Sequence, residues 1–224
     1  MIKKHYEFSF WLRVTHWIRV IAIIILTASG FYIAYPFIAP SQNGGEPVNF
    51  LNALMRSWHV IFGFLLISIT IGKFYLFFFD RQSGVERKSF WDFISPTVWI
   101  KQIKYYLLVG KHPHGKGVYN PLQFMAYIGV YASILLISLT GLILYIHVYH
   151  NGLGGALYGI LSPVEAMLGG LAWVRELHHI AMWIFIIFLP IHIYLAIFNS
   201  VYGKAGAMDS IFSGYRWIKE KDKK

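Results

Sequence analysis

The stretch R-E-L-H-H-I-A-M-W-I-F-I-I-F-L-P-I-H runs from Arg175 to His192 and is apolar, with histidines near both of its ends. Histidine is costly inside a bilayer, so two histidines in one membrane span require specific partners. In a helix, His178 and His192 lie about 40° apart around the axis and roughly 21 Å apart along it. His179 and His192 point in nearly opposite directions. The pattern therefore predicts that His178 and His192, rather than His179, each hold one of two stacked cofactors.

The composition indicates a membrane protein. The chain has 224 residues, of which 57% are hydrophobic and 13% are charged, which is too apolar for an ordinary soluble domain. Its long apolar runs predict an all-α integral membrane protein, a four-helix transmembrane bundle with short interfacial helices, as a single domain over residues 1–224. The chain has no Cys, which excludes thiolate-bound iron–sulfur clusters and haem attachment through C-x-x-C-H.

The positions of the basic residues predict the topology. We expect spans at about residues 12–35, 58–79, 124–147 and 177–201. Most Lys and Arg lie in the N-terminus, the second connection and the C-terminal tail, so both termini are expected to be cytoplasmic. The formal charge of +10 therefore favours contact with anionic lipid over binding of nucleic acid.

Two connecting segments have helical patterns of their own. Residues 156–174 are apolar but interrupted by Ser162-Pro163 and Gly169-Gly170. We expect a short helix at the outer surface there, because a fifth span would put the basic C-terminus on the other side of the membrane. Residues 95–109 have the aromatic and aliphatic face of an interfacial amphipathic helix.

This topology places the membrane histidines in two pairs by depth. His59 and His178 each open a span from the outer side, whereas His16 opens the first span from the cytoplasmic side. His192 lies roughly 21 Å below His178, at the depth of His16. Two axial imidazoles per site describe a bis-histidine b-type haem, whose six-coordinate iron transfers single electrons. A membrane histidine taken singly is more often a hydrogen-bonded structural residue, but the pairing of four favours two haems.

Arg13, Arg56 and Arg175 each precede one of these histidines by three residues. Such an arginine lies on nearly the same helix face as its histidine, one turn closer to water. Arginine suits the bidentate contacts that haem propionates make. The alternative is simple snorkelling at helix ends, yet the only two basic residues expected on the outer side both have this spacing.

Three glycines lie where a porphyrin would need close approach to its helices. Gly63 lies one turn after His59, and Gly30 lies near the face of His16. Gly141, in the third expected span, would let that helix pack closely.

Two motifs resemble those of a known family. R-V-T-H-W-I at residues 13–18 and R-E-L-H-H-I-x-x-W-x-x-x-x-F-x-x-x-H at residues 175–192 are similar to the two signatures of the cytochrome b subunit of membrane-bound nickel–iron hydrogenases. The resemblance covers all four spans and extends to the formate dehydrogenase gamma subunit and bacterial cytochrome b561-type proteins. Ser29 stands where the first signature usually has Thr before Gly, and Glu176 takes a position usually filled by a small residue.

The resemblance implies an electron-transfer subunit with two haem b groups, in the bacterial inner (cytoplasmic) membrane. A hydrogenase on the outer face, consisting of an iron–sulfur small subunit and a nickel–iron large subunit, would supply electrons from hydrogen. Electrons would pass from the side of His59 and His178 to the side of His16 and His192, and then reduce menaquinone or ubiquinone. The chain itself would lack the hydrogen-activating centre.

Quinone reduction needs polar groups near the cytoplasmic interface. The segment H-P-H-G-K-G-V-Y-N-P, just before the third span, supplies four candidates: His112, His114, Tyr119 and Asn120. The alternative for this segment is a solvated loop with an Asn-Pro turn.

Other functions fit the sequence less well. The chain could serve another quinone-linked oxidoreductase such as formate dehydrogenase, or act as a stand-alone cytochrome b561. A di-iron or zinc enzyme would need ligands at i, i+3 or i+4 spacing around one centre, whereas these histidines separate to two depths. A membrane anchor that carries no electrons would be colourless.

Overall fold

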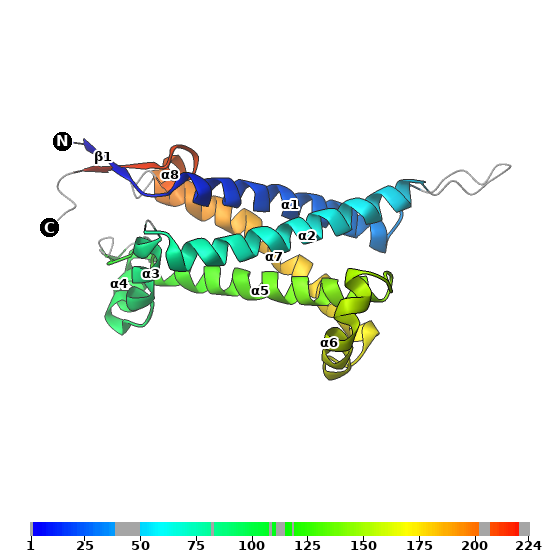
Figure 1. Ribbon diagram of the computed structural model, residues 1–224. Helices are drawn as coiled ribbons and strands as arrows, with labels where there is room; N and C mark the ends of the chain where they lie inside the picture. The colour runs from blue at the N-terminus through cyan, green and yellow to red at the C-terminus, as the bar shows by residue number, and fades with distance from the viewer. Residues whose placement is uncertain are drawn as a thin grey trace. The chain divides into compact units, whose positions relative to one another are not determined.

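The computed structural model describes residues 2–38, 50–81, 83–107, 109–110, 115–117, 119–201 and 207–219. Within these residues, four helices are long and apolar enough to cross a membrane. They are α1 (Phe10–Ala34), α2 (Phe50–Phe79), α5 (Pro121–Ile146) and α7 (Leu171–Val201) (Figure 1). The prediction of an all-α protein with four membrane spans is confirmed.

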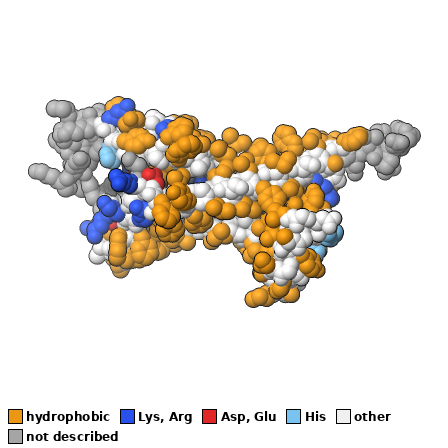
Figure 2. Space-filling view, viewed as in Figure 1, with side chains coloured by type: hydrophobic (Ala, Val, Ile, Leu, Met, Phe, Trp, Pro, Cys, Tyr) orange, Lys and Arg blue, Asp and Glu red, His pale blue; other side chains and the backbone are white. Residues whose placement is uncertain are grey.

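The long helices expose their apolar side chains instead of burying them. Only 17–22% of the most apolar window of each helix is buried inside the protein. Ile21, Ile61 and Ile71 are each more than half exposed, and Figure 2 shows hydrophobic side chains along the long helices. A surface of this kind is stable against lipid tails but not against water. The chain is therefore a multi-pass membrane protein.

Two of the long helices begin earlier than the sequence indicated. Helix α2 starts at Phe50 rather than near residue 58, and α7 starts at Leu171 rather than near residue 177. The added turns consist mostly of good helix formers, so the polar residues within them do not end the helix. As a result Arg56 and Arg175 lie inside α2 and α7, with their side chains exposed.

The connection between α5 and α7 forms a short helix rather than a fifth span. Helix α6 (Leu153–Met167) has 15 residues, fewer than the number needed to cross a bilayer. Gly169 and Gly170 follow it with φ of 91° and 90°, a conformation that glycine adopts without steric cost. The short helix that we expected is therefore present, although residues 171–174 belong to α7.

Three more short helices accompany the long ones. They are α3 (Gly84–Phe93), α4 (Pro96–Tyr106) and α8 (Ala207–Ser213). Helix α4 confirms the expected amphipathic segment and begins with Pro96, whose fixed φ suits the first helical position. Ile100 and Ile103 of α4 are exposed while Gln102 is buried. This helix turns its apolar face outward, as expected for a helix at a lipid interface.

The chain divides into two compact units, and each long helix contributes to both. Unit 1 comprises Met1–Thr15, Gly72–Ser133 and Ile184–Lys224, and unit 2 comprises His16–Ile71 and Ile134–Trp183. The prediction of one domain over residues 1–224 stays a prediction.

In unit 1, the two ends of the chain pair as a small antiparallel sheet. Strand β1 (Ile2–Tyr6) pairs with β2 (Tyr215–Lys219), with Tyr6 opposite Tyr215. Gly214 precedes β2 with a φ of 86°, and Arg216 donates to Glu7 at 2.9 Å. The sequence indicated only a basic tail here, because local pattern does not reveal pairing between segments about 200 residues apart.

Gly214→Val is expected to loosen this sheet. Its Cβ would lie 2.9 Å from Tyr6 Cε2 and 3.0 Å from the Phe8 carbonyl oxygen, and the left-handed backbone costs a branched residue about 1–3 kcal/mol. Trypsin should then cleave after Arg216 faster than in the native protein. Gly72→Ala, at an open position in the same unit, is the control. Equal cleavage of the two variants would contradict this expectation.

Candidate functional site

Unit 2 brings two of the predicted haem ligands close together. The imidazole rings of His59 on α2 and His178 on α7 have centroids 6.2 Å apart, with ring planes at 63°. Two imidazoles that bind one metal ion from opposite sides, each through a bond of about 2 Å, place their centroids about 6 Å apart. The separation of these two rings therefore fits one haem iron.

A serine on α1 orients the first of these rings. Ser29 Oγ lies 2.9 Å from His59 Nδ1 and donates to the Ile25 carbonyl oxygen at 2.7 Å. Because a hydroxyl has only one proton, Ser29 accepts a hydrogen bond from the imidazole Nδ1–H. The lone pair of His59 is then on Nε2, the nitrogen that must face a metal.

A threonine on α5 plays the same part for the second ring. Thr140 Oγ1 lies 2.9 Å from His178 Nδ1 and donates to the Leu136 carbonyl oxygen at 2.8 Å. It too accepts from an Nδ1–H, which leaves Nε2 of His178 free to bind a metal. The two histidines therefore have the same tautomer and equivalent support from neighbouring helices.

A glycine follows each hydroxyl residue and lets the helix approach the ring. A Cβ at Gly30 would lie 3.3 Å from His59 Cε1, and one at Gly141 would lie 3.2 Å from His178 Cε1. Both distances are tighter than ordinary van der Waals contact. These glycines make room for the imidazoles, whereas the sequence indicated room for a porphyrin. Of the three glycines that the sequence singled out, Gly63 is the one whose Cβ position faces open space.

The predicted inner-haem residues Arg13 and His192, both in unit 1, have other contacts than the histidine pair of unit 2. Arg13 donates to the Phe212 carbonyl oxygen at 2.5 Å, and its Nε is buried without a hydrogen-bond partner among the described residues. His192 stacks on Phe188 with a centroid distance of 5.2 Å. His16 belongs to unit 2, where its ring contacts Trp17 at 5.4 Å. The pairing of His16 with His192 joins two units and stays a prediction.

Arg56 and Arg175, the two predicted propionate-binding arginines of unit 2, have exposed side chains. Arg56 and Arg175 are exposed one helical turn before His59 and His178, and Arg56 Nε donates to Asn52 Oδ1 at 3.1 Å. A planar guanidinium in this position has donors to offer a carboxylate.

The segment before α5 is tied to α3 and α4. Tyr119 OH donates to Glu86 at 2.9 Å, and Asn120 Nδ2 donates to Tyr106 OH at 3.1 Å. His112 and His114, the other two residues of the predicted quinone site, lie outside the described residues. The buried carboxylate of Glu86 therefore contacts Tyr119, one of the residues predicted for the quinone site.

Ser29 and Thr140 are the site residues that sequence reasoning missed. Ser29 stood out only as a departure from the usual Thr, although it keeps the hydroxyl that contacts His59. A usable signal was present, because a hydroxyl residue directly precedes glycine at both positions. Among the described residues, no group of three or more His, Asp or Glu side chains is arranged to hold a metal ion.

The four membrane-spanning helices and the sequence profile together define a multi-pass membrane cytochrome of the b type. The chain belongs to the prokaryotic cytochrome b561 family, whose sequence profile matches residues 7–214. Membership in a cytochrome b family makes haem b the cofactor, and the ring separation and tautomers of His59 and His178 fit that group.

Curated relatives resemble the chain over nearly its whole length. A probable Ni/Fe-hydrogenase B-type cytochrome subunit from Azotobacter vinelandii is 26% identical over 93% of this chain and 87% of its own length. The protein of the same name from Cupriavidus necator is 25% identical over 98% of this chain and 89% of its own. A probable Ni/Fe-hydrogenase 1 B-type cytochrome subunit from Escherichia coli K12 is 24% identical over 96% and 92%.

Substitution of adjacent histidines tests which imidazole holds haem. His178→Ala is expected to lose a large part of the bound haem, because the ring of His178 lies 6.2 Å from that of His59. His179→Ala is the matched control and should keep the native haem content. Haem extracted per purified chain measures both. The reverse result would show that the helical phase of α7 is wrong.

Removal of the supporting hydroxyls tests how the rings are oriented. Ser29→Ala and Thr140→Val are each expected to weaken haem retention by roughly 10- to 100-fold, the usual effect of losing a hydrogen bond to a metal-binding histidine. Ser29→Thr and Thr140→Ser keep the hydroxyl and are the controls. Competition with a haem-binding apoprotein measures retention. Native retention in Ser29→Ala and Thr140→Val would contradict this role.

Proposed function

We propose that this chain is the di-haem cytochrome b subunit of a membrane-bound nickel–iron hydrogenase. It anchors the iron–sulfur small subunit and the nickel–iron large subunit at the outer face. It passes electrons from hydrogen oxidation across the membrane to the quinone pool. The observation that carries this proposal is the opposed pair His59 and His178, each with Nδ1 held by a hydroxyl.

The names of the relatives support the choice of partner. Those in Azotobacter vinelandii, Cupriavidus necator and Escherichia coli are all called Ni/Fe-hydrogenase B-type cytochrome subunits. Each aligns over at least 93% of this chain, so the likeness includes all four long helices.

The proposed ligands form two sites. His59 and His178 hold the outer haem b, and His16 and His192 hold the inner one. Arg56 and Arg175 contact the propionates of the outer haem, and Arg13 contacts those of the inner haem. Haem b supplies a centre that accepts and donates one electron at a time.

The proposed orientation has both termini in the cytoplasm of a bacterium and the chain in its inner membrane. The basic N-terminus and tail and the basic connection between α2 and α5 support it, because cytoplasmic segments are enriched in Lys and Arg. Quinone, as menaquinone or ubiquinone, is reduced at the cytoplasmic end near Tyr119 and Asn120, with His112 and His114.

A second candidate keeps the haems and changes the partner. The family is named for cytochrome b561 as a whole, so a formate dehydrogenase or another quinone-linked enzyme is the alternative donor. A stand-alone cytochrome b561 would have no such partner.

Purification in mild detergent from the native membrane identifies the donor. The cytochrome is expected to carry hydrogenase subunits with it, and hydrogen should reduce its haem in membranes, seen as a reduced-minus-oxidised absorbance change. Formate serves as the control donor. Reduction by formate but not hydrogen would favour the alternative, and fewer than two haems per fully loaded chain would contradict the di-haem assignment.

A further inference from the structure

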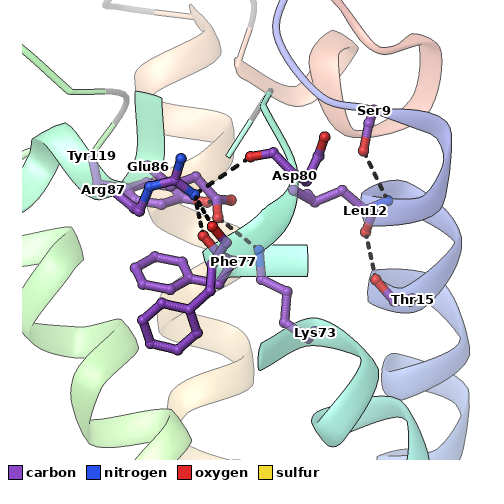
Figure 3. A network of polar contacts seen from close by, with 10 residues as sticks. Ser9, Leu12, Thr15, Lys73, Phe77, Asp80, Glu86, Arg87 and Tyr119 are labelled. Atoms are coloured by element: carbon purple, nitrogen blue, oxygen red, sulfur yellow. Dashed lines mark hydrogen bonds and ion pairs between the residues drawn. The ribbon is translucent and has the colours of Figure 1, made fainter. Parts of the chain in front are cut away.

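Unit 1 buries an ion pair that none of the roles above uses. Lys73 Nζ on α2 donates to Glu86 Oε2 on α3 at 2.7 Å, and the two side chains are only 10% and 4% exposed. The hydroxyl of Tyr119 donates to the other carboxylate oxygen, Oε1, at 2.9 Å. Figure 3 shows the three side chains converging where α2 ends and α3 begins.

The structure has other contacts that join these segments. Arg87 donates to the carbonyl oxygens of Phe77, Phe78 and Asp80 and so ties α3 to the end of α2. A cation there also complements the negative end of the helix dipole.

The segment carrying Tyr119 is fixed in a similar way. Gly117 N donates to Asp92 Oδ2 at 2.8 Å, and Tyr119 N donates to Ser89 Oγ at 3.1 Å. Glu86 is therefore not needed to hold this segment on α3.

A buried ion pair is also a weak source of stability. Removing two charges from water costs several kcal/mol each, and apolar replacements of such pairs are often neutral or stabilising. Lys73 lies within α2, a helix long and apolar enough to cross a membrane, and ionisable groups in such helices more often serve proton or ion transfer. The pair of Lys73 and Glu86 is therefore better explained by a function than by stability.

The pair is linked through packed aromatic rings to His192, a proposed haem ligand that lies in the same unit. The ring of Tyr119 packs on Tyr127 with centroids 4.5 Å apart, and Tyr127 lies 6.3 Å from the ring of His192. Two aromatic rings therefore separate the buried carboxylate from a proposed haem ligand.

Tyr119 remains a hydrogen-bond donor under physiological conditions. Burial, together with the negative charge of Glu86, raises the pKa of Tyr119 well above its usual value. The phenol therefore keeps its proton at neutral pH.

We propose that Glu86 supplies protons through Tyr119 to the quinone that this subunit reduces, with Lys73 stabilising the carboxylate that is left behind. This inference rests on the proposed function, which brings both electrons from hydrogen oxidation. In this inference Glu86 does not touch the quinone itself and acts on it through Tyr119.

Each proton transfer is balanced. Glu86 first takes up a proton from water on the cytoplasmic side, and its ion pair with Lys73 opens. The O–H bond of Tyr119 then breaks as a bond forms between that proton and a quinone oxygen, the proton on Glu86 moves to the phenol oxygen, and the Glu86 carboxylate pairs with Lys73 again. Two such transfers and two electrons convert one quinone to one quinol.

Glu86→Gln tests this inference in membranes that hold the whole complex. Reduction of haem by hydrogen should keep its native rate, while reduction of added short-chain ubiquinone or menaquinone analogue should slow about 100-fold, as for loss of a proton donor. Glu86→Asp should recover a large part of the rate. A native rate of quinol formation in Glu86→Gln would overturn the inference.

Glu7→Gln is the matched control. Glu7 is a second buried glutamate of unit 1, is 6% exposed in its side chain and is paired with Arg216 at 2.9 Å. This variant should form quinol at the native rate. Slowing equal to that of Glu86→Gln would overturn the inference, because any broken ion pair of unit 1 would then suffice.

Two further measurements keep the test decisive. If the Glu86→Gln variant loses haem, the Tyr119→Phe variant is measured in its place. A native rate of quinol formation in Tyr119→Phe overturns the inference. Infrared difference spectra after reduction by dithionite should contain a carboxyl band that is absent from Glu86→Gln. Because dithionite is the reductant, the infrared measurement needs no hydrogenase and tests the inference alone. The proposed function fails by a different result, namely that hydrogen does not reduce the native haem.

Discussion

Two hydrogen bonds from imidazole to hydroxyl are the interactions on which unit 2 depends. Ser29 holds His59 and Thr140 holds His178, and each hydroxyl gives its own proton to a carbonyl of its helix. Inside a bilayer no water is present to satisfy a misplaced imidazole. The bonds therefore set both the direction of each ring and the nitrogen that carries its lone pair, which is the requirement for an axial haem ligand.

Unit 1 solves a different physical problem. Its polar groups lie around the C-terminal end of α2 and the start of α5, where Glu86 accepts hydrogen bonds from Lys73 and Tyr119. Electron transfer alone needs no such charges, but reduction of a quinone consumes protons as well as electrons. Unit 2 thus carries groups suited to holding a metal, and unit 1 carries the groups that we propose exchange protons.

Much of the fold followed from residue chemistry alone. The four spans were predictable because a bilayer requires about twenty apolar residues in succession, and α6 was predictable as a short helix because its apolar run is broken. The starts of α2 and α7 were not predictable from the sequence. Arg56 and Arg175 lie inside these helices, and no local signal marks where the helices begin. The sheet of β1 and β2 was also missed, because it joins the two ends of the chain.

The sequence by itself determined the membrane class of this protein and the candidate ligands, because charge and histidine are rare enough in apolar helices to stand out. Helical periodicity also singled out His178 over His179. Only the tertiary structure decided what supports the ligands, since Ser29 and Thr140 lie on helices other than those of His59 and His178. The same holds for Glu86, whose partners come from separate segments and meet only when the helices pack.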